Sequence, residues 1–377
     1  MKTNWQTKKL GDICDIYQPK TISAKEMTLN GKYVVFGANG IIGRYDKYNH
    51  EEPQLLITCR GATCGSVNIS EPKSWITGNA MVVRPKDSSL DFKFLEYLFR
   101  GGLNISKVIT GAAQPQITRT NLEPIEISYP ESLIEQKRIV KILDEVFENV
   151  EKAKEGAEKN LQNSKALFES YLQNIFANKG KNWEEKKFGD VLQKTETVDP
   201  TKKPNEEFVY LDVSSVNKET KEIENVTLVM GKDAPSRAKK LIKTNDVIFA
   251  TVRPTHSRVA LITEEYNNQV CSTGYFVLRA KEFLNNNLVY YFLLTHGFNK
   301  QMEKLQKGAS YPAVTDGEVK GIIISFPKSI TEQKTIVKKL DLLSEQTKKL
   351  EVIYKKKLTD LEELKKSVLK KAFSGEL

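Results

Sequence analysis

Two segments of the chain repeat apolar side chains at the seven-residue spacing that is typical of coiled-coil helices. They lie in residues 131–180 and 328–377. The first six positions of the two series are Ile139, Leu143, Val146, Val150, Ala153 and Ala157, and then Ile336, Leu340, Leu343, Thr347, Leu350 and Tyr354. Each member of the second series follows its counterpart by 197 residues. The pattern therefore predicts two long helices with the same apolar stripe.

The sequence also contains signals for the start of each helix. Pro130 and Pro327 precede them, and Ser132 and Ser329 each have a glutamate three positions later, which is the spacing of a capping box. Each series extends over roughly 40–45 residues, or about 60–65 Å of α-helix. The two stripes can pair within one chain as an antiparallel coiled coil with a pseudo-twofold axis, or in parallel between two chains as a homodimer. We favour the intramolecular pair, because one chain always holds both stripes.

The segments between the helices have short apolar runs that are typical of strands. In residues 1–130 these runs are Leu55–Thr58, Ala80–Val83 and Ile125–Ser128, with a helical pattern at Phe92–Arg100. In residues 181–327 they are Asp246–Phe249, Tyr275–Leu278 and Ile322–Ile324, with a helical pattern at Leu288–Leu305. Strands and helices joined by irregular polar loops predict two α+β domains.

The two halves are copies of one frame. Residues 111–144 and 308–341 agree at about half of their positions, and share Gly111/Gly308, Pro115/Pro312 and an identical Glu-Gln-Lys. Asn4-Trp5 near the start is matched by Asn182-Trp183. Between these anchors the two halves diverge. We therefore expect two homologous domains, residues 1–130 and 181–327, which carry different specificities and are followed by helical spacers at residues 131–180 and 328–377.

Composition narrows the class of protein. The formal net charge is +10, which favours a polyanionic partner such as nucleic acid. No run of eighteen apolar residues is present, so we expect no membrane helix. The first residues, Met1 to Gln6, have no apolar core of a signal peptide, so we expect a cytoplasmic protein.

Catalytic and metal-binding patterns are missing from the sequence. The four cysteines form no Cys-x-x-Cys pair and the three histidines lie far from them, so we expect reduced, mostly buried thiols and no metal site. Val34–Gly43 has glycines at a dinucleotide-like spacing, but no helical pattern follows it. The chain has no P-loop, no Pro-Pro of an adenine methyltransferase motif and no Gly-x-Ser-x-Gly elbow. We expect no catalytic residues.

These features resemble the specificity subunits of type I restriction–modification systems over essentially the whole chain. The resemblance rests on the two Pro-x-Ser helix starts with Glu-Gln-Lys-x-Ile-Val, on the turn Gly111–Ile117, on Arg60–Thr63 after a strand, and on the terminal Ala372–Leu377. The second copy departs from it, since Tyr311 stands for Gln114 and Ala313 for Gln116, and Arg253-Pro254 stands where Arg60-Gly61 would be.

The resemblance implies a non-catalytic subunit that recognises a bipartite target in double-stranded DNA with one target-recognition domain per half-site. It also implies that the helices bind two methyltransferase subunits, and that two motor–endonuclease subunits join through them. S-adenosylmethionine, ATP and Mg would then belong to those partners. The alternative is a coiled-coil scaffold that assembles proteins without binding DNA.

The residues best suited to contact DNA are polar side chains in loops after strands, because arginine pairs with guanine and asparagine or glutamine with adenine. In the first domain they are Arg60, Thr63, Gln114, Gln116 and Arg119. In the second they are Arg253, Thr255, His256, Arg258 and Tyr311. We expect these residues to form two separate DNA-contact surfaces.

Overall fold

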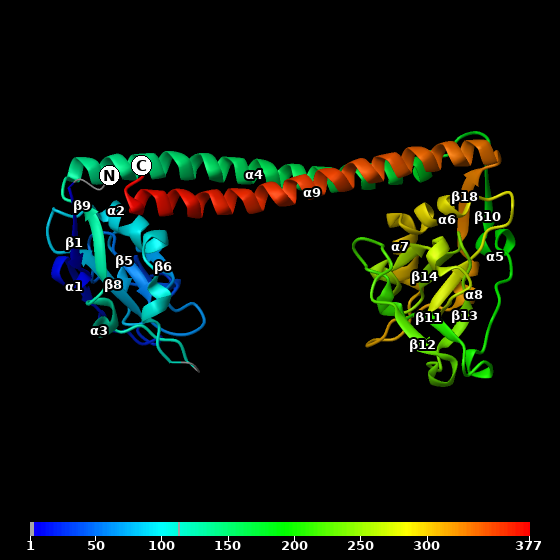
Figure 1. The fold of residues 1–377 in the computed structure, drawn as a ribbon, viewed down its shortest axis with the longest axis horizontal. Helices are drawn as coiled ribbons and strands as arrows, with labels where there is room; N and C mark the ends of the chain where they lie inside the picture. Colours follow the sequence, from blue (N-terminus) through cyan, green and yellow to red (C-terminus); the bar gives the residue numbers. More distant parts are fainter. Residues whose placement is uncertain (1–3, 112–113) are drawn as a thin grey trace. The chain divides into compact units, whose positions relative to one another are not determined.

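The structure, a computed structural model, describes residues 4–111 and 114–377. It divides into two compact units, the first made of Met1–Glu158 and Lys355–Leu377 and the second of Lys159–Tyr354. Each unit holds one α+β domain, the start of one long helix and the end of the other (Figure 1). The predicted fold class is thereby confirmed, and the helices pair antiparallel within one chain. The limits of the four predicted segments stay a prediction, because each compact unit combines a domain with parts of both helices.

The two long helices are α4 (Leu133–Ala177) and α9 (Ile330–Ser374), each of 45 residues. In the first unit, Ile139 of α4 shares a buried apolar cluster with Leu369 of α9. In the second unit, Leu172 of α4 shares another with Leu340 of α9. The Oγ of Ser329 accepts a hydrogen bond from the Glu332 N–H at 3.4 Å, as its predicted N-cap role requires.

Of the six stripe positions given for each helix, all are buried or half-buried except Leu350. Leu350 is 37% exposed. An α-helix with 3.6 residues per turn drifts from a strict seven-residue repeat, so distant members of the series rotate away from the partner helix. The stripe position Thr347 and the neighbouring polar side chain Ser164 are buried in the second unit, each bonded to a backbone carbonyl of the preceding turn.

The first domain contains three sheets. Its four-stranded antiparallel sheet has the order β2 (Cys14–Tyr17), β8 (Ala80–Pro85), β5 (Leu55–Thr58) and β6 (Val67–Ile69). The others are β4 (Gly40–Tyr45), β3 (Tyr33–Gly37) and β7 (Trp75–Ile76), and the pair β1 (Trp5–Lys9) and β9 (Glu126–Pro130). The short helices are α1 (Leu10–Ile13), α2 (Phe92–Tyr97) and α3 (Arg119–Leu122). The predicted strands fall on β5, β8 and β9.

The second domain also contains three sheets. Its four-stranded sheet has the order β12 (Thr227–Met230), β11 (Glu207–Leu211), β16 (Val270–Ser272) and β13 (Ala238–Leu241). The others are β15 (Val259–Leu261), β14 (Val247–Ala250) and β17 (Tyr275–Leu278), and the pair β10 (Trp183–Lys187) and β18 (Ile323–Pro327). The short helices are α5 (Phe188–Val191), α6 (Asn286–Leu293), α7 (His296–Leu305) and α8 (Asp316–Lys320).

The continuous helix predicted at Leu288–Leu305 is wrong, because the structure has the two helices α6 and α7 there. Thr295 separates them by capping both ends. Its hydroxyl donates to the Phe292 carbonyl at 2.7 Å and accepts from the Phe298 N–H at 3.2 Å. A threonine with these bonds replaces the helical backbone pattern by a local one.

A buried glutamine joins each domain to the long helix that follows it. Gln136 and Gln333 are both fully buried and occupy the same place in the repeated Glu-Gln-Lys. The Gln333 amide accepts from the Asn285 N–H at 2.8 Å and donates to the carbonyls of Phe283 and Pro327 at 2.9 and 2.8 Å. Gln136 makes the same three bonds, to the Asp91 N–H and to the Ser89 and Pro130 carbonyls.

A tyrosine–aspartate bond makes a second connection about two turns further along each helix. The Tyr97 hydroxyl donates to Asp144 of α4. The Tyr291 hydroxyl donates to Asp341 of α9 at 2.5 Å. In both pairs burial, followed by the neighbouring carboxylate, raises the pKa of the tyrosine. The identical residues of the repeat therefore include those that attach domain to helix.

Substituting Gln333→Met should lower the free energy of unfolding of the second unit by about 2–3 kcal/mol, because it leaves a buried N–H and two carbonyls without this partner. Urea unfolding of the full chain measures the loss. The exposed Gln301 of α7 provides the control, since Gln301→Met should change stability by less than about 0.5 kcal/mol. Equal losses for the two variants would show that the buried amide is not what joins the domain to α9.

Candidate nucleic-acid interface

In the first domain, the loop after β5 lies against the turn before α3. The Ile117 N–H donates to the Cys59 carbonyl at 2.9 Å, and the Gly61 N–H donates to the Pro115 carbonyl at 3.1 Å. Arg60 faces Gln116 in an isolated antiparallel bridge. Two segments that are more than fifty residues apart in the sequence therefore form one surface. Of the predicted turn, Ala112 and Ala113 lie outside the described residues.

The second domain builds the same surface after β14. The Val314 N–H donates to the Thr251 carbonyl at 2.9 Å, and the Arg253 N–H donates to the Pro312 carbonyl at 2.7 Å. Val252 faces Ala313 in an isolated bridge. Loops that differ in sequence thus have the same backbone frame in both domains.

This frame corrects the alignment of the two loops by one residue. We expected Arg253-Pro254 to replace Arg60-Gly61, but Val252 stands opposite Ala313 as Arg60 stands opposite Gln116. Arg253 therefore has the place of Gly61, and both have a positive φ, +49° for Arg253 and +86° for Gly61. The sequence alone could not establish this register, because the loops after β5 and β14 share no residue that would align them.

The structure brings four of the five predicted residues of the first domain to this surface. Arg60, Thr63, Gln114 and Gln116 are exposed in the loop and the turn. Arg119 is also exposed but lies at the first position of α3, where its guanidinium pairs with Glu123 at 2.6 Å. No bound nucleic acid tests any of these residues, so their contacts to DNA stay a prediction.

In the second domain the predicted residues have different environments. Arg253, exposed at the loop tip, places its guanidinium 5.2 Å from the ring centroid of Tyr311. Arg258 instead points its guanidinium at the carbonyls of Val216 and Ser214 and so supports a neighbouring turn. Thr255 is half-buried, and its carbonyl accepts from the Asn299 amide at 3.1 Å.

The local electrostatic field of this second loop is positive. Partial burial, followed by the charges of Arg253, Lys218 and Arg258, lowers the pKa of His256. Burial, followed by the charge of Arg258, lowers the pKa of Lys221 to about 8. Neighbouring positive groups disfavour each other's charged form. A bound anion such as a phosphate stabilises these charged forms.

Sequence reasoning missed Lys218 and Lys221. The Lys221 ammonium donates to the Ser257 carbonyl at 2.7 Å, which places the turn of residues 217–222 beside the candidate loop. Asn217 shapes that turn, since its side-chain oxygen accepts from the Glu219 N–H at 2.8 Å. The sequence indicates a polar turn at residues 217–222, but it does not indicate that the fold places this turn beside the loop of Arg253.

Among the residues that the structure describes, two of the few arginines without an ion pair or a side-chain hydrogen bond lie at the tips of the two candidate loops. The chain has ten arginines, and seven use their guanidinium in an ion pair or a hydrogen bond: Arg44, Arg84, Arg100, Arg119, Arg138, Arg258 and Arg279. Within residues 4–111 and 114–377, no such contact engages Arg60, Arg237 or Arg253, and all three are exposed. One free arginine therefore lies in each candidate loop.

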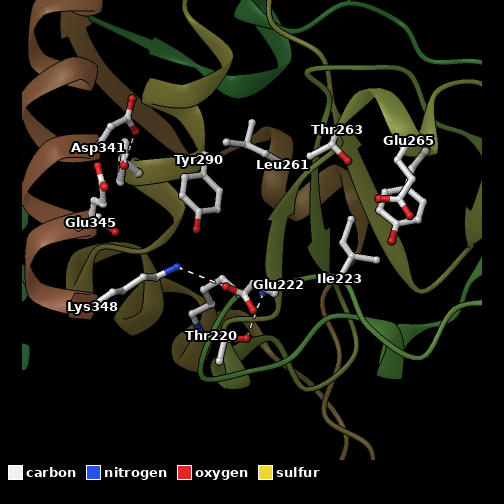
Figure 2. Close-up of a pocket in the computed structure, with 14 residues that line it drawn as sticks. Thr220, Glu222, Ile223, Leu261, Thr263, Glu265, Tyr290, Asp341, Glu345 and Lys348 are labelled. Carbon is white, nitrogen blue, oxygen red and sulfur yellow. Dashed lines mark hydrogen bonds and ion pairs between the residues drawn. The ribbon is translucent and has the colours of Figure 1, made fainter. Parts of the chain in front are cut away.

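A separate hollow in the second unit has the opposite character. It has a volume of about 620 Å³ and lies between α9, α6 and the turn of residues 217–222 (Figure 2). Its charged lining consists of Glu222, Glu265, Asp341, Glu345, Lys221 and Lys348. Four carboxylates against two ammonium groups repel phosphate, so this hollow does not support a nucleic-acid site.

The structure also places the glycine-rich segment and the four cysteines. Val34–Gly43 forms the hairpin of β3 and β4, with no helix behind it. The four cysteines are unpaired, and Cys14, Cys59 and Cys271 are buried. Among the described residues, no group of three histidine, cysteine or carboxylate side chains is placed to hold a metal ion. In the same residues we find no helix with the length and apolar character needed to cross a membrane.

The chain is similar to known proteins over its whole length. The family described as "Type I restriction modification DNA specificity domain" matches residues 2–161 and 180–361, one match per half. The EcoDI specificity subunit of Escherichia coli is 21% identical over all of this chain and 89% of its own length. The MjaVIII specificity subunit of Methanocaldococcus jannaschii is 22% identical over 99% of this chain and 93% of its own.

A solved structure supports the fold independently of close sequence similarity. It comes from work on complex assembly and conformational transition of the type I restriction–modification system, and is 16% identical with a TM-score of 0.77. The match covers 99% of this chain and 98% of that one. The duplicated frame, the paired helices and the two family matches agree, and the chain belongs to the type I restriction–modification specificity family, as a specificity subunit and not an enzyme.

Proposed function

We propose that this subunit recognises a bipartite target in double-stranded DNA, with one domain for each half-site, and that it docks the methyltransferase subunits of its complex. The observation that carries the proposal is the pair of loop surfaces that share a backbone frame and differ in side chains. A frame held constant while its exposed residues vary is suited to recognise two different short sequences.

The polar side chains on these surfaces suit base edges and phosphates. The first surface exposes Arg60, Gln114 and Gln116. The second surface exposes Arg253 and Tyr311, close to the positive groups that lower the pKa of His256. Arginine and the amide side chains form the bidentate pairs that distinguish guanine and adenine in the major groove. Lysines beside them supply phosphate contacts that position the protein without sequence preference.

The partners and the cellular location are part of the same proposal. Two methyltransferase subunits dock on the chain and two motor–endonuclease subunits join through them, in the cytoplasm. S-adenosylmethionine, ATP and Mg belong to these partners and not to this chain. The sequence supports this division of roles, because it contains neither a P-loop nor the Pro-Pro of an adenine methyltransferase motif.

DNA affinity of the complex with its methyltransferase partner should fall steeply with salt, because bound lysines and arginines release counterions from the phosphates. For six or more phosphate contacts, raising the salt from 50 to 200 mM weakens binding by about a thousandfold or more. Fluorescence anisotropy with a labelled duplex gives the slope of log K against log salt. A Lys218→Gln variant should reduce that slope by about one.

A matched lysine supplies the control for this titration. Lys349 is exposed on α9 and already pairs with Glu345 at 2.7 Å, so Lys349→Gln should leave the slope unchanged. A slope near zero for the unaltered complex would favour the alternative function, a scaffold that binds proteins only.

A further inference from the structure

Arg253 has an unusual backbone for a residue with a long side chain. Its φ of +49° and ψ of +56° lie in the left-handed region, and its N–H is held by the Pro312 carbonyl at 2.7 Å. Side chains other than glycine and asparagine rarely adopt this conformation, and strained residues of this kind cluster where a ligand is bound. The first domain has Gly61 at the equivalent position, so the frame itself does not require an arginine.

The guanidinium of Arg253 is oriented by an aromatic ring and has no charged partner. It lies 5.2 Å from the ring centroid of Tyr311, whose side chain is 72% exposed. In the described part of the chain, no carboxylate lies within 4.0 Å of it. Contact with an aromatic face favours one orientation of the planar fork and leaves its N–H donors available to a ligand.

We propose that Arg253, held over Tyr311, recognises a guanine in the half-site of the second domain by donating to its O6 and N7 in the major groove. This inference rests on the proposed function. Tyr311 is a positioning residue in it, because it orients the guanidinium. The first domain cannot make this contact from the same backbone position, since Gly61 has no side chain and Arg60 projects from the residue before it.

A guanine is a better fit than a phosphate for this group. Lys218 lies beside the loop and supplies a point charge of the kind that contacts phosphates. A fork fixed on a ring has a defined donor pattern, and the bidentate arginine–guanine pair is the commonest specific contact in the major groove. The experiment must therefore distinguish a contact to guanine from a contact to a phosphate.

The experiment uses the full chain in complex with its methyltransferase partner. Methylation mapping first identifies the bipartite motif, whose second half must contain a G·C pair. Duplexes then carry 7-deazaguanine, which lacks N7, or inosine, which keeps both O6 and N7, at each guanine of that half. For one guanine, 7-deazaguanine should weaken binding by about tenfold to a hundredfold, and inosine should not weaken it.

Variants of the arginine complete the test. Arg253→Ala should weaken binding to unmodified DNA by at least that factor, because it removes the contacts to both O6 and N7. It should show no further loss with 7-deazaguanine and should relax methylation at that one base pair. Arg253→Gly should do the same without lowering thermal stability, because glycine suits the positive φ. Tyr311→Phe should retain specificity and Tyr311→Ala should lose part of it at the same base pair. Arg60→Ala should leave the second half of the motif unaltered.

Two results would overturn the inference while leaving the proposed function intact. One is a bipartite motif whose second half contains no G·C pair. The other is an Arg253→Ala complex that loses the same factor on every sequence, as the loss of a phosphate contact would. If the unaltered complex methylates no bipartite motif at all, the proposed function itself fails, and the two failures are therefore distinguishable.

Discussion

Exchanging residues 181–327 for the corresponding segment of a related chain should change one half of the methylated motif completely and leave the other half unchanged. The structure favours this because β10 and β18 pair along their whole length, from Trp183↔Pro327 to Lys187↔Ile323. Both ends of the exchanged segment therefore lie in one two-stranded ladder, and the candidate loop surface lies wholly between them. Methylation mapping in cells that also produce the methyltransferase partner measures the outcome.

The reciprocal exchange is the control. Residues 1–130 are closed in the same way by β1 and β9, from Trp5↔Pro130 to Lys9↔Glu126. Replacing them should change the other half of the motif only. The buried Gln136 and Gln333 lie outside both exchanged segments, on the long helices, and bond mainly to backbone groups of the domains. A foreign domain therefore needs only backbone groups to meet Gln136 or Gln333, together with a tyrosine that bonds Asp144 or Asp341. A change in both half-motifs after either exchange would contradict two independent domains.

The arrangement of helices and strands could be predicted from the sequence, because both halves of the chain repeat the same pattern. The apolar stripes place α4 and α9, and their lengths of 45 residues agree with the expected range. Fully buried strands such as β5 and β17 stand out as short apolar runs between polar turns. The break between α6 and α7 was missed, because Thr295 is compatible with a helix interior until its hydroxyl is seen to cap both neighbours.

The candidate site was less predictable than the fold. Exposed residues of the turn before α3 follow from the repeat, which has the same spacing in both copies. The loop after β14 has no such guide, so the register of Arg253 was misplaced by one residue and the role of Arg258 in bonding Val216 was not foreseen. Lys221 reaches the loop from 36 residues away in the sequence. Side chains that meet only through the folded backbone leave no local pattern.

The strand that leads to the Arg253 loop is anchored by a buried ion pair at its other end. Asp246 immediately precedes β14, and Arg279 immediately follows its neighbour β17. Two bonds of 2.7 Å join the carboxylate to the guanidinium, and a third, of 2.9 Å, joins it to the Lys243 N–H. The Asp246 side chain is 1% exposed and that of Arg279 is 14% exposed. Charged groups so far from water depend on each other, because neither can replace its partner by solvent.

Asp246→Ala should therefore lower the free energy of unfolding of the second unit by about 3–5 kcal/mol, since it leaves a buried guanidinium without this partner. A loss of that size lowers the Tm of a unit of about 200 residues by roughly 10 °C. Hydrogen exchange resolved by peptide measures it, and protection should fall across β14 and β17 while β5 and β8 of the first unit keep theirs. Glu196 provides the matched control, because it contacts the same Arg279 at 2.8 Å but is 44% exposed. Glu196→Gln should cost less than about 1 kcal/mol, as exposed ion pairs do. Equal effects of the two substitutions would mean that burial does not make the Asp246 pair special, and the loop of Arg253 would need another anchor.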